Sequence, residues 1–222
     1  MKMLLTERID QWNDRFFSNC RARLKLAELT ITQLEWLTLE HFQFSQRNPG
    51  LLEHAADMTR GLPRVHAELR RNCAEESGHA QLYQAGLAAL GLEVARREWF
   101  APTDEFLDWL QELILATPSQ TLGVMYATES AAIFEHQVFK EAGLLLTAAK
   151  GLSGEALLHF HNMHLEGVEQ GHKDGLGAII SAAQAADSAQ TAIVLNEVSR
   201  GAWMAIKAME SWWSALLRHC NQ

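Results

Sequence analysis

Two short motifs in this sequence place a histidine three residues after a glutamate: Glu76–His79 and Glu169–His172. In an α-helix, three residues turn the chain by about 300° and advance it by about 4.5 Å, so both side chains lie on one face. A carboxylate and an imidazole placed in this way can bind one metal ion or two adjacent ions. A further glutamate on an otherwise apolar segment, Glu40 or Glu129, precedes each motif by about 40 residues.

This ligand set favours two iron or manganese ions. Bridging carboxylates offset the charge of two divalent cations and leave positions open for dioxygen, whereas zinc prefers fewer carboxylates. A single E-x-x-H motif arises by chance in many helical chains, but two copies, each behind a further glutamate, indicate a site. Buried glutamates without a partner would otherwise be costly. The sequence therefore predicts two Fe²⁺ per chain, with manganese as the alternative metal, and the ligands Glu40, Glu76, His79, Glu129, Glu169 and His172.

His164 is a seventh candidate ligand. It lies eight residues before His172, so the two side chains are about 80° apart on a regular helix. A one-residue π-bulge near Gly167 would bring His164, Glu169 and His172 into line, and such bulges occur at functional sites. We therefore expect a bulge at this glycine if His164 is a ligand.

Other titratable residues are expected outside the site. His41 directly follows Glu40, so on a helix it points about 100° away from it. Glu135 and His136 follow Glu129 by about two turns and are alternative ligands if the helix register differs; otherwise they form a solvated pair. The histidines expected on solvent-facing surfaces are His54, His66, His159 and His161.

Both tyrosines lie one helical turn from predicted ligands. Tyr83 follows His79 by four residues, and Tyr126 precedes Glu129 by three. A phenol beside a metal–oxygen centre can donate a hydrogen bond or an electron, although half-buried tyrosines more often only pack their rings. Tyr83 and Tyr126 are therefore the predicted catalytic residues.

The chain is predicted to be all-α. Only four prolines occur, and Leu, Ala, Glu, Gln and Met recur at three- and four-residue steps. About seven helices with short connections are expected, in a single domain over residues 1–222. The expected helices span about 6–26, 30–47, 51–60, 63 to Gly86 or Gly91, 103–116, 118–143, 155–172 and 188–219.

Composition narrows the function classes. The 222 residues are 48% hydrophobic, enough for a folded core, and the net charge of −8 disfavours nucleic acid and anionic membranes. No signal peptide or membrane span is evident, so a cytoplasmic protein is expected. The three cysteines lie far apart, which leaves oxygen and nitrogen as metal ligands. A small-molecule substrate is the expected partner, and a homodimer is a candidate assembly.

Two stretches resemble the haem-oxygenase-like di-iron oxidases and oxygenases, relatives of the thiaminase-II (TenA-like) helical fold. They are residues 122–130, L-G-V-M-Y-A-T-E-S, and residues 140–144, K-E-A-G-L. The resemblance extends over most of the chain. In that family, the irons are held by an early glutamate, a carboxylate–histidine pair, a glutamate after L-G-x-x-Y-x-x-E, and a final H-x-x-x-D-x-x-H helix. The positions that match one by one are Glu40, Glu76, His79 and Glu129.

The final motif departs from the family pattern. From His164 to His172 the run is one residue longer, and Glu169 stands in place of aspartate. His172 therefore ranks first as a ligand of this helix, Glu169 second and His164 third. The resemblance implies an O2-dependent enzyme that oxidises an amino acid, amine or fatty acid by C–C cleavage, desaturation or N-oxygenation. No nucleophilic cysteine context is evident near Glu129, which disfavours thiamine hydrolysis.

Two other interpretations of the fold and function stay open from the sequence. The order E…E-x-x-H…E…E-x-x-H is also the usual arrangement of ferritin-like four-helix bundles, which oxidise or store iron. A metal-free helical ligand-binding protein of the thiaminase-II-like fold is the second alternative. A haem protein is disfavoured, because His41 is the one candidate axial ligand in the first two predicted helices.

Overall fold

The structure is a computed structural model that describes residues 3–98, 100–186 and 191–222. Within these ranges every regular element is helical, which confirms the predicted all-α class. Two short 3₁₀ turns (Leu26–Glu28 and Val94–Arg96) and one π-helical turn (His164–Val168) accompany the α-helices. The α-helices are α1 (Leu5–Arg23), α2 (Ile31–Met58), α3 (Pro63–Glu75), α4 (His79–Ala89), α5 (Ala101–Ile114), α6 (Pro118–Lys150), α7 (Glu155–Met163), α8 (Glu169–Ala185) and α9 (Leu195–Cys220).

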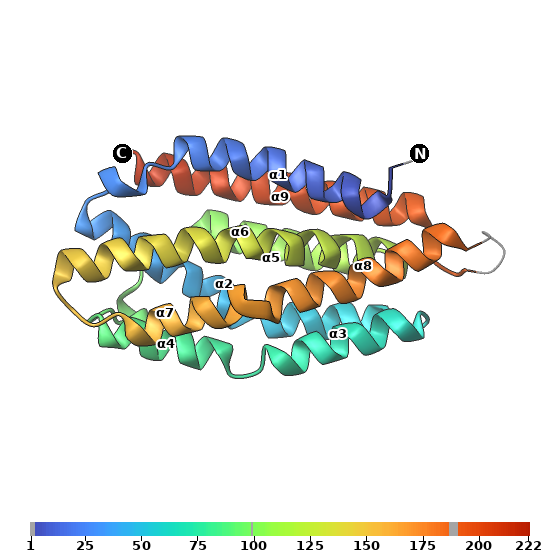
Figure 1. Cartoon of the computed structure of the whole chain (residues 1–222), viewed down its shortest axis with the longest axis horizontal. Coiled ribbons are helices and arrows are strands. Elements are labelled where there is room, and N and C mark those ends of the chain that lie inside the picture. Colours follow the sequence, from blue (N-terminus) through green and yellow to red (C-terminus); the bar gives the residue numbers. More distant parts are fainter. Residues whose placement is uncertain (1–2, 99, 187–190) are drawn as a thin grey trace.

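The long helices run along one axis of the molecule (Figure 1). α6 lies at the centre and packs on α2, α7, α8 and α9. α1 lies along α9 on one side of the bundle, and α3 and α4 lie on the other side. Phe139, Trp212 and Trp213 are fully buried between these layers. Because α6 contacts α2, α7 and α8, side chains from all these helices can meet beside it.

α2 is longer than the sequence predicts. It continues through Asn48-Pro49-Gly50, so the helices predicted on either side of this breaker form one helix. An interior proline removes a hydrogen bond and costs about 3 kcal/mol or more. Leu52 and Ala55, which follow the proline, are completely buried, and α2 packs extensively on α3. This burial outweighs the local cost of the proline.

The long helix predicted from Pro63 to Gly86 or Gly91 is divided into α3 and α4. The two helices are separated at Gly78, whose φ of +91° lies in the left-handed region that favours glycine. Glu76 caps the end of α3, and His79 is the first residue of α4. The expectation that these two side chains share one face of a continuous helix is therefore wrong: they flank a turn.

α6 continues past Gly143, which the sequence predicts as its end, and closes at Gly151, where φ is +63°. Gly143 lies where α6 meets α7, and a β carbon there would be 2.9 Å from Leu157 Cδ2. The glycine therefore permits close packing of the two helices. The predicted helix start at Glu155 is confirmed, and the predicted start of the last helix at Ser188 lies outside the described residues.

None of the helices that the structure describes is both long enough and apolar enough to span a bilayer.

Candidate metal centre

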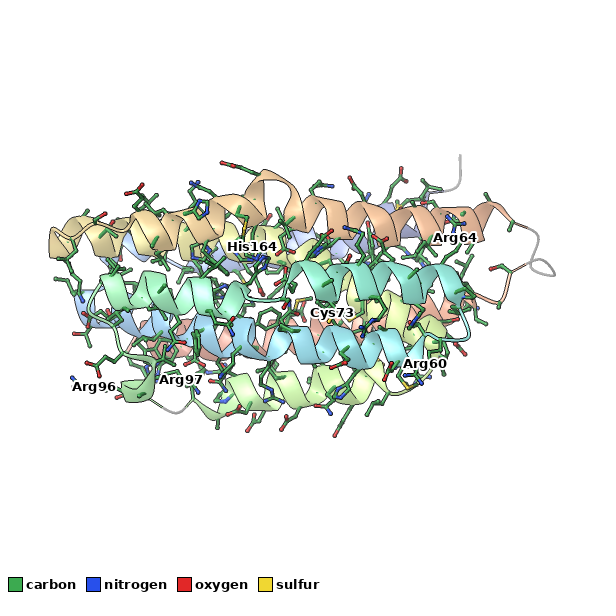
Figure 2. All side chains as sticks on the ribbon, turned by 90° about the horizontal axis from the view of Figure 1, so that it is seen from below. Arg60, Arg64, Cys73, Arg96, Arg97 and His164 are labelled. Carbon is green, nitrogen blue, oxygen red and sulfur yellow. The ribbon has the colours of Figure 1, made fainter. Side chains whose placement is uncertain are left out.

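Six of the seven residues predicted as metal ligands lie together in the middle of the bundle, and all six side chains are buried. They come from the α3–α4 turn and the start of α4, from α6, from the π-helical turn and from the first turn of α8. Figure 2 shows one of them, His164, midway along the molecule and facing the break between α3 and α4. The six residues are Glu76, His79, Glu129, His164, Glu169 and His172.

The first triad comprises Glu76, His79 and His164. Glu76 Oε2 lies 3.1 Å from His79 Nδ1, and Glu76 Oε1 lies 3.7 Å from His164 Nε2. His164 Nδ1 is 2.8 Å from the carbonyl oxygen of Phe160, which can only accept a hydrogen bond, so this nitrogen carries the proton. In the neutral ring, His164 Nε2 would then present its lone pair toward Glu76, as a metal ligand requires.

The second triad comprises Glu129, Glu169 and His172, and one ligand atom from each lies within 4.8 Å of the others. His172 Nδ1 is 3.2 Å from Glu129 Oε2. The two triads adjoin, because His164 Nε2 lies 4.0 Å from Glu169 Oε1. This arrangement can hold two neighbouring ions, with Glu169 between them.

The π-helical turn aligns the ligands of the last motif. His164 opens the turn and Glu169 follows it as the first residue of α8. Gly167 lies inside the turn with φ +154° and ψ −21°. The extra residue in the run from His164 to His172 is accommodated there, and the predicted bulge near Gly167 is confirmed. Without it, His164 would lie about 80° from His172 around the helix.

Replacing Gly167 by alanine is expected to destabilise the protein by about 1–3 kcal/mol, because its φ of +154° is costly for a residue with a β carbon. Nothing lies within 4 Å of a β carbon built at this position, so the strain would come from the backbone alone. We also expect weaker metal binding, because relief of the strain would shift His164 relative to Glu169. Urea unfolding and metal titration measure the two effects.

Gly171→Ala is the matched control for this change. A β carbon at Gly171 also meets nothing within 4 Å, but this glycine lies in regular helix within α8, where alanine is favoured by about 0.5–1 kcal/mol. Equal stability of the two variants would show that the π-turn does not depend on glycine.

The buried carboxylates of Glu76, Glu129 and Glu169 make the site electrostatically favourable for a cation. Burial raises the pKa of Glu76, but the neighbouring imidazoles of His164 and His79 lower it to about 2. The pKa of Glu169 is raised well above its ordinary value, first by burial and then by the charges of Glu129 and Glu76. Glu76 Oε1 has no hydrogen-bond partner. A buried carboxylate oxygen without a partner, beside two further carboxylates and three imidazoles, fits a bound cation.

Glu75 forms a hydrogen bond with His172 on the outer side of the cluster. Its Oε2 lies 3.0 Å from His172 Nε2, the ring nitrogen that does not face Glu129. Burial lowers the pKa of His172, but Glu129, Glu76 and Glu75 together raise it above its ordinary value. A metal-binding histidine commonly donates its second N–H to a carboxylate, which orients the ring and increases its basicity. Glu75 has this position relative to His172.

Glu75→Gln is expected to lower metal affinity by about 10–100-fold while leaving the fold intact, because it weakens the partner that orients His172. Glu68→Gln is the matched control: Glu68 also pairs with Arg71 but makes no contact with His172. Metal titration against a competing chelator measures both affinities. Equal affinities in the two variants would contradict this role of Glu75.

A small cavity of about 30 Å³ adjoins the two triads, which is room for a few water-sized groups at most. Its wall combines ligands of the cluster with apolar and neutral polar side chains from α2, α6 and α7. The residues outside the triads that line it are His41, Phe44, Ser45, Asn48, Thr128, Ala132, Glu135, His136 and Phe160.

Glu40 does not join the cluster, contrary to its predicted role as a ligand. It is 1% exposed, and both of its carboxylate oxygens lack a hydrogen-bond partner. Its surroundings include Thr103 and Asp104 of α5, on the other side of α2, and burial raises its pKa to about 7. The next residue, His41, points toward the cavity instead. One position on a helix is a rotation of about 100°, so the choice between neighbours depends on how α2 is turned in the bundle.

The two tyrosines predicted as catalytic lie away from the triads. Tyr83 is completely buried and its hydroxyl donates a hydrogen bond to the carbonyl oxygen of Thr38, at 2.8 Å. The hydroxyl of Tyr126 donates to Asp10 Oδ1 at 3.0 Å, toward α1. Neither hydroxyl contacts a ligand of the cluster, so the structure gives both tyrosines packing and hydrogen-bonding roles.

Three histidines that the sequence analysis excluded or left as alternatives lie in the core. His41 and His161 are buried, although His161 was expected to face solvent, and His136 Nε2 lies 3.2 Å from Glu169 Oε1. Glu135 is also buried and accepts a hydrogen bond from Trp213 Nε1, so it is not a solvated residue. A signal for His136 was present, since it follows Glu129 by two helical turns. By contrast, His54 and His159 are exposed, as predicted.

Comparison with solved structures identifies the fold. A CADD-like protein of unknown function from Nostoc punctiforme is 23% identical, with 98% of this chain and 97% of that chain covered and a TM-score of 0.81. A domain of unknown function with a heme oxygenase-like fold from Shewanella denitrificans is 13% identical, with 97% and 91% covered and a TM-score of 0.71. A TenA homologue from Pseudomonas syringae is 14% identical, with 94% and 92% covered and a TM-score of 0.69. The predicted haem-oxygenase-like architecture is confirmed, in place of the ferritin-like alternative.

The sequence itself matches no curated protein. Residues 25–219 match one family model, described as a Domain of Unknown Function with solved-structure structure (DUF3865). The matched range contains both triads and the π-helical turn. The chain therefore belongs to the DUF3865 family.

Proposed function

We propose that this protein is an O2-dependent non-haem di-iron oxidase or oxygenase that acts on a small organic substrate. One observation carries the proposal: two buried triads of carboxylates and imidazoles adjoin one another, and Glu76 Oε1 in the first lacks any hydrogen-bond partner. Glu76, His79 and His164 would hold one ion, and Glu129, Glu169 and His172 would hold the other.

The donor set supports iron or manganese. Three carboxylates and three imidazoles offset most of the charge of two divalent ions and are all hard or borderline ligands. Sites with this mixture in helical bundles typically hold iron or manganese pairs. When bound, two ferrous ions supply electrons for the reduction of O2.

The residues around the cluster suit an oxidation that must be shielded from water. Phe44 and Phe160 form apolar parts of the cavity wall, and Ser45, Asn48 and Thr128 add neutral hydrogen-bonding groups. Burial of the cluster strengthens its electrostatic interactions and keeps solvent from competing with substrate. A substrate with an oxidisable carbon or nitrogen beside a polar group, such as an amino acid, amine or fatty acid, matches this lining. Because the cavity is small, substrate entry requires side chains to move.

The test is anaerobic reconstitution of the full chain with ferrous iron, followed by metal analysis by plasma emission and by measurement of O2 uptake. We expect about two irons per chain, as for paired carboxylate sites, and O2 uptake that depends on a member of an amino acid, amine and fatty acid panel. Failure to retain iron would overturn the proposal in favour of a metal-free ligand-binding protein. Stoichiometric O2 uptake on iron addition alone, unaffected by every panel member, would instead indicate iron oxidation as the activity.

A further inference from the structure

Three more histidines meet in the core, next to the two triads but outside them. They are His41 of α2, His136 of α6 and His161 of α7, and all are buried. One nitrogen from each lies within 4.8 Å of the others. His136 Nδ1 is 3.0 Å from His161 Nδ1, and the ring centroid of His41 is 5.4 Å and 5.7 Å from those of His136 and His161.

Several of these nitrogens have no partner. His41 lacks one at both Nδ1 and Nε2, and His161 lacks one at Nε2. A neutral imidazole has one donor and one acceptor nitrogen, and each left unsatisfied in a core costs about 1–3 kcal/mol. His41 also stacks on Phe139, with ring centroids 4.1 Å apart, in a position where an apolar side chain would avoid this cost. Imidazoles in such a place therefore point to a ligand.

We propose that His41, His136 and His161 form a third metal site, made of imidazole nitrogens alone, for zinc or copper. The group contains neither a carboxylate nor a thiolate, unlike the two triads. Zinc and copper are among the metals that imidazole ligands suit, whereas paired carboxylate-rich sites in helical bundles hold manganese or iron. Two nitrogens bound tetrahedrally to one zinc ion lie about 3.3 Å apart, close to the 3.0 Å between His136 and His161 Nδ1.

Two of the rings are neutral. Burial lowers the pKa of His41 to about 3 and lowers the pKa of His161 well below its ordinary value. At pH 7 each of these rings therefore has a nitrogen lone pair available without loss of a proton to solvent.

His136 connects this site to the neighbouring cluster. Its Nδ1 faces His161, and its Nε2 lies 3.2 Å from Glu169 Oε1. A metal ion on Nδ1 would place the proton on Nε2, which then donates to Glu169 in the carboxylate–histidine–metal arrangement common in metal sites. Occupation of the three-histidine site would thus orient a carboxylate of the second triad. His136 is in this sense a positioning residue for Glu169.

The test uses the full chain with the first two sites disabled by His79→Ala/His172→Ala. This variant, prepared metal-free, is titrated separately with Zn²⁺ and with Cu⁺ against a competing chelator. We expect about one ion per chain, and at least tenfold weaker binding when His161→Phe is added. His159→Phe is the matched control, because His159 lies on the same helix two residues earlier and is exposed. The two arms compare the affinity of the site for Zn²⁺ with its affinity for Cu⁺.

X-ray absorption on the loaded double variant tests the site without relying on a further substitution. Three nitrogen ligands at about 2.0–2.1 Å are expected for zinc. Absence of both Zn²⁺ and Cu⁺ binding, binding unchanged by His161→Phe, or a shell dominated by oxygen would each overturn the proposal. Iron retention by the unaltered chain tests the two triads separately, so failure of the third site and failure of the di-iron proposal are distinguishable.

Discussion

The double substitution His79→Ala/His172→Ala is expected to abolish iron retention in the reconstituted protein. Together the two changes remove one ligand from each triad: His79 from the first and His172 from the second. Loss of an outer hydrogen-bond partner alone lowers metal affinity by about 10–100-fold, and loss of a direct ligand costs at least as much. The remaining carboxylates would be left with fewer imidazoles to offset their charge. Plasma emission on gel-filtered samples measures the iron that remains.

His54→Ala is the control for this experiment, because His54 lies on α2 with an exposed side chain. Thermal unfolding of the parent should also shift upward when iron is added, since a ligand that binds the folded state stabilises it by mass action. The double variant should lose that shift but keep its helical circular dichroism. Equal iron content in the parent, the double variant and His54→Ala would disprove the ligand assignment.

Between pH 4.5 and pH 8, Glu40→Gln is expected to gain about 3 kcal/mol of stability relative to the parent while its iron content stays unchanged. Burial raises the pKa of Glu40 from 4.5 to about 7 in the folded state. Below pH 4.5 the carboxyl is protonated in both states, so ionisation costs nothing. Between pH 4.5 and 7 the unfolded state releases its proton first, and stability falls as pH rises, by about 1.4 kcal/mol per pKa unit. Glutamine removes this loss.

Urea unfolding of both proteins at pH 4.5 and pH 8 measures the effect. The constant cost of burying the amide cancels when the difference between parent and variant is compared at the two pH values. Glu53→Gln, an exposed glutamate of the same helix, should change stability by less than about 1 kcal/mol at either pH. Loss of iron from Glu40→Gln would instead restore Glu40 as a ligand.

The sequence predicts those parts of the site in which the residues involved are close together in the chain. Glu169 and His172 lie three residues apart in regular helix at the start of α8, and a helix places such a pair on one face wherever it lies. The extra residue after His164 requires a bulge if His164 is to align with this pair, and Gly167 is the residue that permits its backbone conformation. These features depend on helix geometry alone.

The packing of the helices determined which of the candidate side chains come together in the site. Helix periodicity does not determine which side of α2 faces α6, so Glu40 was preferred to His41 although the rotation of the helix puts His41 beside the cavity. Gly78 in the left-handed conformation divides the predicted helix at Glu76 and His79, yet the two side chains still meet across the turn, where α3 and α4 both pack on α2. The sequence thus determined which residue types can bind metal and which local backbone conformations are available. Only burial against distant helices selected the side chains that meet, because that selection depends on contacts between residues far apart in the chain.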